Sequence, residues 1–356
     1  MKLRFTWVEL LVVIIIIAIS LAILIPVLNS YREADRTARC INNSHQIGQA
    51  FQTYAATFNN TFLPSAKIIK APNGTQTVGG FSFLVKLQSF MEYESPYRSL
   101  PLTLPSGIDP EDISNQTIAT QKTVAFHVLV DSMNTQISGF LCPSSPRGSA
   151  WRASSAQGIT NYKAMGATTR GSLAMVLHPQ ATPPYGTTKI HPDGAIFPST
   201  NNLPASDLLD GLSHTIITIE TMDETASRWT VGKEATLVGL PQKSSPTGPM
   251  PQAPYNFFTP PGFVNDYNWD EKSSTTKAGL RTFLSYDFSP SGADAGKYED
   301  PGFSKTPPAY GPSSAHPAVV ICGFGDGSVQ AISKQIDAAN LFFLITKNNS
   351  DPFFVP

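Results

Sequence analysis

The chain has 356 residues, a formal net charge of −1 and a charged fraction of only 14%. It carries no basic field, so nucleic acid is excluded as a partner. The 30 prolines and 25 glycines exceed the usual share and indicate many turns, hence a β-rich structure with long loops.

The first thirty residues contain the longest apolar run. Leu10–Leu28 comprises nineteen residues without a charge, and as a helix it would span about 28 Å, close to the roughly 30 Å of a bilayer's hydrocarbon core. Lys2 and Arg4 precede it, which predicts a cytoplasmic N-terminus with the rest of the chain outside. A secretory signal peptide is the alternative, but no small-residue cleavage site follows the run.

The segment FTWVELLVVI, Phe5 to Ile14, resembles the N-terminus of type IV prepilins and pseudopilins, usually G-F-T-L-V-E-L-L-V-V-I. In that family a prepilin peptidase cuts after the glycine and methylates the new N-terminal Phe. The resemblance implies processing before Phe5, assembly through a Glu9 carboxylate that pairs with a neighbouring subunit's ammonium, and a helix kink at Pro26. Arg4 stands where the family has glycine, and the peptidase recognises that position closely.

A helical stem should follow Pro26 and end at Asn59-Asn60. Apolar and small residues recur there at spacings of one helical face, which should pack against the globular domain. The predicted face comprises Ile41, Gly48, Phe51, Ala55 and Phe58. Opposite charges at Glu33–Arg36 and Asp35–Arg39 indicate a solvated or headgroup-level first half.

The stem also begins a second resemblance, to a large bacterial family with a prepilin-like N-terminus and a domain of unknown function, which some schemes file under solute binding. Arg39–Asn43 resembles its R-x-C-x-N-N block. Later blocks match F-L-C-P-S at Phe140–Ser144, T-N-Y at Thr160–Tyr162 and H-x9-D-G at His316–Gly327, and Asp210–Glu220 resembles the family's D-G-T-S-N-T-I…E segment. Asp210-Gly211 is a turn signal, and Thr215–Glu220 should form a buried strand.

The H-x9-D-G block predicts a hairpin with strands Val319–Phe324 and Ser328–Ile332. His316 would cap its start, and Asp326, before Gly327, would stabilise the turn through its own backbone. The alternative is a metal role, with calcium at Asp326 and Asp210, although histidine is a poor calcium ligand. We also expect a strand at Ala195–Phe197 and a short helix or strand at Asp337–Leu344.

The three cysteines, Cys40, Cys142 and Cys322, form no C-x-x-C motif, so a zinc or redox motif is not supported. If the domain is exported, one pair can form a disulfide, and Cys40 with Cys142 is the pair that we name. The alternative is three small buried residues.

An aromatic, proline-rich insertion covers about residues 241–269. Its Tyr255, Phe258 and Trp269 could stack on a sugar or a partner. The alternative is that these rings fold back as a satellite core.

No hydrolase, metalloprotease or nucleotide-binding motif is present, so we expect neither catalysis nor a cofactor. The predicted layout is a basic leader at 1–4, a transmembrane helix at 5–28, a helical stem at 29–59 and an extracytoplasmic domain at 60–356, with the hairpin at 316–333. The expected fold is α+β and pilin-like, with the long helix packed on an antiparallel β-rich domain.

The expected function is a structural one. The chain would be a pilin- or pseudopilin-like subunit of an envelope filament or secretion apparatus, single-pass in the inner membrane, with its domain in the periplasm or cell envelope. Its partners would be membrane lipid, prepilin peptidase, and other copies of itself or other pseudopilins. The alternative is a tethered extracytoplasmic protein that binds glycans or small solutes.

Overall fold

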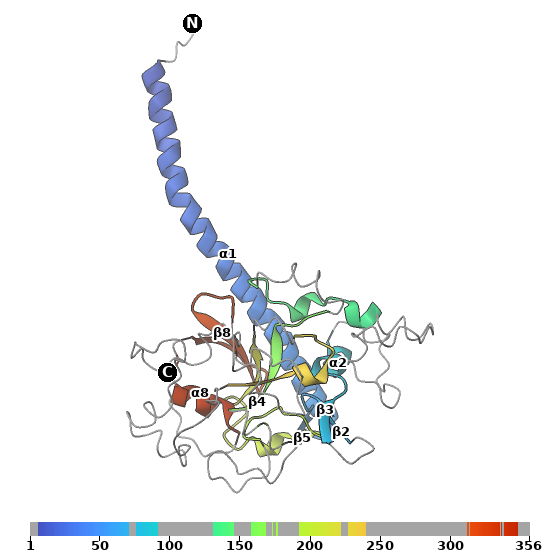
Figure 1. Cartoon of the computed structure of the whole chain (residues 1–356). Coiled ribbons are helices and arrows are strands. Elements are labelled where there is room, and N and C mark those ends of the chain that lie inside the picture. Colours follow the sequence, from blue (N-terminus) through green and yellow to red (C-terminus); the bar gives the residue numbers. More distant parts are fainter. Residues whose placement is uncertain are drawn as a thin grey trace, which may run out of the picture.

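The structure is a computed structural model of the whole chain (Figure 1). The described residues are 6–70, 76–91, 131–145, 158–168, 173, 176, 192–221, 227–239, 312, 314–334, 336 and 338–347. Arg4, Phe5 and the 241–269 insertion with Tyr255, Phe258 and Trp269 lie outside them.

One helix, α1, joins the N-terminal apolar run to the globular part of the chain. It runs without interruption over Trp7–Thr57, 51 residues, and so passes through Pro26 as a continuous, gently curved helix (Figure 1). It ends as expected, because Asn59 and Asn60 adopt positive φ angles of 52° and 55° that cannot continue a helix.

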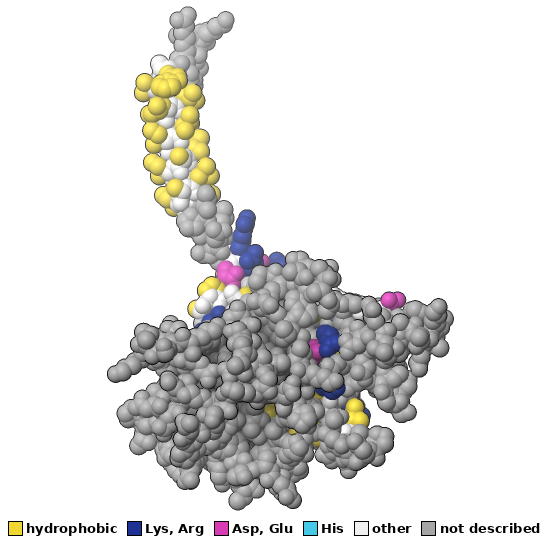
Figure 2. All heavy atoms as spheres, viewed as in Figure 1, with side chains coloured by type: hydrophobic (Ala, Val, Ile, Leu, Met, Phe, Trp, Pro, Cys, Tyr) yellow, Lys and Arg dark blue, Asp and Glu magenta, His cyan; other side chains and the backbone are white. Residues whose placement is uncertain are grey.

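The N-terminal part of α1 protrudes from the globular domain and is apolar on all sides (Figure 2). Over the described residues, Trp7–Leu24 is the one helical stretch long and apolar enough to cross a membrane, a test that a signal sequence also passes. Its polar Ser20 donates its hydroxyl to the Ile16 carbonyl at 2.8 Å, so the hydroxyl needs no outside partner.

A five-stranded sheet forms the centre of the globular domain, in the order β7-β4-β6-β8-β9. Its strands are β4 Tyr162–Ala167, β6 Ile216–Glu220, β7 Thr236–Val238, β8 Val319–Phe324 and β9 Val329–Ser333. Neighbouring strands are antiparallel except β4 and β7, which are parallel. The sheet is therefore mixed, which corrects the purely antiparallel expectation, while β6 and the β8–β9 hairpin lie where the sequence predicts them.

Smaller elements surround this sheet. Two-stranded ladders join β1 Thr61–Phe62 with β5 Leu203–Pro204, and β2 Lys67–Lys70 with β3 Gln76–Gly79. Short α-helices include α2 Phe83–Leu87 and α8 Ala338–Ile345. Single 3-10 turns lie at Gln88–Phe90, Ser138–Phe140, Ala205–Asp207 and Gly232–Glu234.

The strand expected at Ala195–Phe197 is absent, although these residues are buried. The segment lies against the end of β4 without forming a regular ladder with it. A Cβ at Gly194 would lie 2.5 Å from the Gly166 backbone, and Ile196 makes one ladder-like bond, from its amide to the Met165 carbonyl at 3.2 Å.

The sheet lies between α1 and α8, and its residues alternate between the two helices as strand geometry requires. On β8, Ile321 packs with Cys40 of α1, whereas Val320 and Cys322 belong to the core beside α8. The face of α1 that packs includes Gly48, Phe51 and Ala55 of the predicted face, which are buried, and extends further around the helix. Cys40, Ser44, Ile47, Phe51 and Tyr54 are buried, whereas Ile41 is half-buried and Phe58 is 44% exposed.

Candidate functional site

A disulfide joins the stem to the globular domain. Cys40 on α1 and Cys142, just after the Ser138–Phe140 turn, are bonded with their Cα atoms 5.2 Å apart, across 102 positions of sequence. Both are buried, and Cys322 is a free, buried thiol on β8. The cross-link therefore fixes the helix at the point where it meets the sheet.

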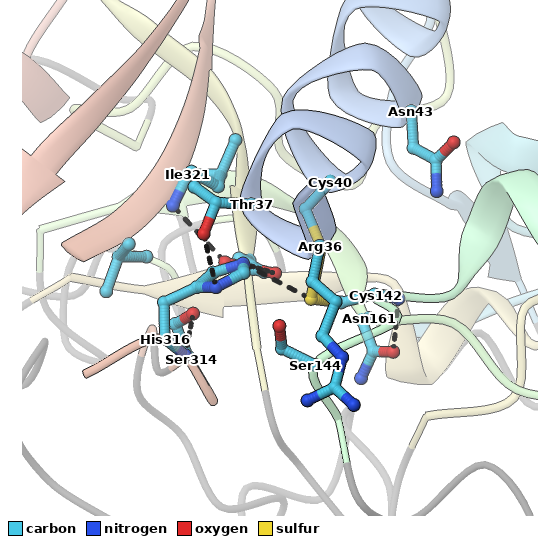
Figure 3. Close-up of polar contacts among 12 residues, drawn as sticks. Arg36, Thr37, Cys40, Asn43, Cys142, Ser144, Asn161, Ser314, His316 and Ile321 are labelled. Atoms are coloured by element: carbon cyan, nitrogen blue, oxygen red, sulfur yellow. Dashed lines mark hydrogen bonds and ion pairs between the residues drawn. A yellow bond between two sulfur atoms is a disulfide. The ribbon is translucent and has the colours of Figure 1, made fainter. Parts of the chain in front are cut away.

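His316 lies against this disulfide and bridges it to two carboxylates (Figure 3). Its Nδ1 is 2.7 Å from Glu33 Oε1 and 3.1 Å from Thr37 Oγ1, both on α1. Its Nε2 is 3.4 Å from Cys142 Sγ and 3.7 Å from Glu220 Oε1. A carboxylate only accepts hydrogen bonds, so the contact with Glu33 places a proton on Nδ1 and directs Nε2 toward the sulfur and Glu220.

Glu220 ends β6 inside the protein, with 1% of its surface exposed. Burial is the main cause that raises the pKa of this carboxyl, against the opposing effects of His316, the Ser314 side chain, the Ile321 amide and Lys334. Its Oε2 accepts from the Ile321 amide at 3.3 Å, but Oε1 has no hydrogen-bond partner among the described residues. This oxygen is the orphan acceptor of the cluster.

Glu33 behaves differently, because it lies at the edge of the cluster. Burial raises its pKa, but hydrogen bonds from His316 and Ser144 and the charges of His316 and Arg36 outweigh this and lower the pKa overall. Ser144 donates to Glu33 Oε1 at 2.9 Å, two residues beyond Cys142. An ionised Glu33 therefore holds the His316 ring from the stem side.

The backbone around the disulfide is held by two further side chains. Asn161 accepts from the Cys142 amide at 2.9 Å and donates to the Thr221 carbonyl at 3.0 Å. Tyr162 donates its hydroxyl to the Cys40 carbonyl at 3.1 Å. Burial, with the nearby Glu220 charge, raises the pKa of Tyr162 well above its usual range, so it stays a donor.

The far end of the H-x9-D-G block contacts the same helix about two to three turns beyond the disulfide. Gln52 of α1 donates to the Gly325 carbonyl, and a Cβ at Gly48 would lie 3.1–3.2 Å from Gly327 atoms. Gly327 has φ +85°, and Asp326 accepts from the Ser328 amide at 2.8 Å, the turn role that the sequence suggested. His316 and the Asp-Gly turn thus both contact the stem.

Replacing Gly48 by Val should separate the hairpin turn from the stem, since the added methyl groups meet backbone atoms that cannot rotate away. We expect a loss of about 1–3 kcal/mol of unfolding free energy, the usual cost of overpacking. Gln49→Val, at an exposed position of the same helix, is the matched control. Equal losses of urea resistance in the two variants would contradict this close contact.

Asp210 and Gly211 belong to a second turn, beside the first. Gly211 has φ +101°, and the Asp326 amide donates to the Leu212 carbonyl at 3.1 Å. Asp210 and Asp326 do not join any cluster of three or more His, Cys, Asp or Glu ligand atoms within the described ranges. Asp210 and Asp326 therefore lie in two turns that pack against each other.

At the start of α1, Glu9 has a local role that the sequence reading missed. Thr6 caps the helix by accepting from the Glu9 amide at 3.3 Å, and the Glu9 carboxylate accepts from the Thr6 amide at 2.8 Å. This is the reciprocal capping box that a T-x-x-E spacing predicts. Glu9 is thus satisfied in the single chain.

Glu33 and Glu220, the two carboxylates that contact His316, were also not predicted as site residues. A signal for Glu220 was present: a carboxylate at the end of a β-branched strand that reads as buried must find a partner or stay neutral. Glu33 offered no such signal, since Arg36 supplied a local ion pair, at 3.7 Å.

Each sequence block of the second resemblance supplies a part of this cluster, and one family model covers them all. The model described as "Protein of unknown function (DUF1559)", SBP_bac_10, matches residues 29–339. The chain belongs to the DUF1559 family. Searches of curated proteins and of solved structures gave no match. In this DUF1559 chain, the matched region begins just after the apolar run and includes Cys40, Cys142, Glu220 and His316.

Proposed function

We propose that this DUF1559 protein is a membrane-anchored structural subunit of pilin or pseudopilin type, which acts in an envelope filament or secretion apparatus without catalysis. The observation that carries this proposal is the continuous helix α1. Its exposed apolar part suits a bilayer or a helical filament core, and its stem is bound to the globular domain by a disulfide.

In this proposal the protein spans the inner membrane once, with its N-terminus in the cytoplasm and its domain in the periplasm or cell envelope. The arginine- and carboxylate-bearing start of the stem would lie at the headgroup level, where Arg39 and Asp35 form an exposed ion pair at 3.0 Å. An oxidising compartment outside the membrane would also favour the Cys40–Cys142 disulfide.

The capping box allows the assembly role of Glu9 to be separated from its local one. Glu9→Gln keeps a side chain that can accept from the Thr6 amide but removes the charge, so filaments or pseudopilus assembly should be lost. Thr6→Ala removes the cap but leaves the carboxylate, so assembly should persist. Electron microscopy of sheared surface material from cells that express each variant provides the readout. Filaments from Glu9→Gln would contradict charge pairing as the basis of assembly.

Processing by a prepilin peptidase is the second step of the proposal, with cleavage between Arg4 and Phe5. Intact-mass spectrometry of the membrane-extracted protein should then give a mass that lacks Met1–Arg4 and carries one methyl group. A mass that retains these four residues would show that the segment is an uncleaved anchor. Arg4→Gly, which restores the family's glycine, is the matched variant and should be processed at least as completely.

The family's short name, SBP_bac_10, favours a second candidate, a tethered protein that binds glycans or small solutes. Its test is glycan-array binding by the full chain in detergent. Binding that is lost on Trp269→Ala, together with absent filaments, would favour this role over the structural one.

A further inference from the structure

Four side chains with metal-binding atoms converge at the junction of stem and sheet. Cys40 Sγ, Cys142 Sγ, a Glu220 carboxylate oxygen and a His316 ring nitrogen all lie within 4.8 Å of one another, and all four residues are buried. They come from four separate parts of the chain: α1, the loop after Ser138–Phe140, the end of β6 and the segment before β8.

Two of the distances between these atoms match the edges of a small coordination tetrahedron. Zinc is held by four ligands at about 2.0–2.3 Å, so neighbouring ligand atoms lie about 3.3–3.8 Å apart. His316 Nε2 is 3.4 Å from Cys142 Sγ and 3.7 Å from Glu220 Oε1. The two sulfur atoms are closer because they are bonded to each other, and all four ligand atoms lie within 4.8 Å of one another.

Two independent features leave Glu220 Oε1 and His316 Nε2 available to bind one ion between them. Glu220 Oε1 is buried without a hydrogen-bond partner in the described part of the chain, although it lies next to His316 Nε2. The other ring nitrogen, Nδ1, contacts Glu33 at 2.7 Å. A carboxylate behind the histidine is the usual support of a metal-bound imidazole, since it fixes the tautomer and the ring orientation.

We propose that Cys40, Cys142, Glu220 and His316 form a binding site for one tetrahedral divalent cation of the zinc class when the Cys40–Cys142 bond is reduced. A dithiol reductant transfers two electrons and two protons to the disulfide and becomes a disulfide itself. As the cation binds, both cysteine thiols release their protons to solvent and bind as thiolates. Glu220 binds as a carboxylate and His316 through neutral Nε2.

The donor set selects the class of metal and the role. Two thiolates and an imidazole favour zinc over calcium or magnesium, which need many oxygen ligands. Four protein ligands leave no position open for a substrate, so the ion would be structural. It would connect the same elements that the disulfide connects, and the two cross-links would exclude each other.

The test uses the full chain in detergent micelles. The chain is reduced with dithiothreitol, the dithiothreitol is removed by gel filtration under argon, and the reduced chain is titrated with Co²⁺. The reduced chain should bind one Co²⁺, with the intense visible bands of tetrahedral coordination and a thiolate charge-transfer band, and Zn²⁺ should abolish both. The disulfide form should show neither. A folded, reduced chain that gives only a weak octahedral spectrum would overturn the proposal.

Variants distinguish this site from adventitious thiol binding. Glu33→Gln changes only the carboxylate that supports His316, so it should weaken Co²⁺ affinity about 10–100-fold. Glu220→Gln should remove one ligand and change the spectrum. Cys322→Ala removes the third thiol and should leave Co²⁺ binding unchanged. If this variant no longer bound Co²⁺, the assignment of the four ligands would be refuted. The reduction is also repeated with Zn²⁺ present throughout. If the reduced chain unfolded in spite of the Zn²⁺, the proposed site would equally be refuted.

Discussion

Replacing Cys40 and Cys142 together by alanine is expected to lower the unfolding free energy by about 4 kcal/mol, the largest effect of any change considered. The bond closes a loop across 102 positions, and loop-closure entropy for about 100 residues amounts to roughly 4.7 kcal/mol in the unfolded chain. Urea unfolding of the full chain in detergent, followed by tryptophan fluorescence without reductant, measures the difference.

Cys322→Ala is the matched control for this experiment. It removes a buried thiol from the neighbouring strand but no cross-link, so its cost should be about 1 kcal/mol, as for an average substitution. If the double variant lost no more than Cys322→Ala, the disulfide would not contribute to stability. The same data would then place the main attachment of the stem in its apolar packing.

His316→Ala is expected to cost about 3 kcal/mol. The ring is 1% exposed, so its removal leaves a cavity and takes from Glu33 the donor that it contacts at 2.7 Å. The cavity is the main cost, since removing a large buried side chain costs about 2–5 kcal/mol, whereas Glu33 is partly exposed and keeps Ser144 as a donor. Thermal unfolding measured by circular dichroism checks the value.

The substitutions His316→Asn and His316→Gln show which ring nitrogen contributes more to the stability that His316→Ala loses. Asn places its amide nitrogen near the position of Nδ1, whereas Gln reaches the position of Nε2. Because Nδ1 makes the contacts with Glu33 and Thr37, His316→Asn should retain more stability than His316→Gln. His45→Ala, at an exposed position of α1, should change stability by less than about 0.5 kcal/mol. The reverse order of Asn and Gln would contradict the assigned contacts.

Much of the fold could be predicted because its signals are local. The Asn59-Asn60 pair ends α1, the β-branched run before Glu220 forms β6, and the glycine-flanked Asp326 makes the hairpin turn. The parallel pairing of β7 with β4 could not be predicted in this way. Thr236–Val238 has only three residues, too few to show a period, and its pairing depends on chain folding far from the strand.

The candidate site shows the same division. Cys40, Cys142 and His316 were named from the sequence, but each with its own role, because nothing local says that they meet. Glu33 was paired with Arg36, three residues away, whereas its contact with His316 spans 283 positions. Sequence reasoning finds partners within a helical turn far more readily than partners brought together by packing.

The disulfide also has a consequence for proteolysis. Because Cys40 is on α1 and Cys142 lies beyond the first part of the globular domain, residues 40–142 form a covalently closed ring. A protease that cuts once inside this ring opens it but separates nothing, and the domain stays tethered to the apolar helix. Separation of the domain from the apolar helix would require a cut after Cys142, a cut between the apolar run and Cys40, or a cut within the ring followed by reduction.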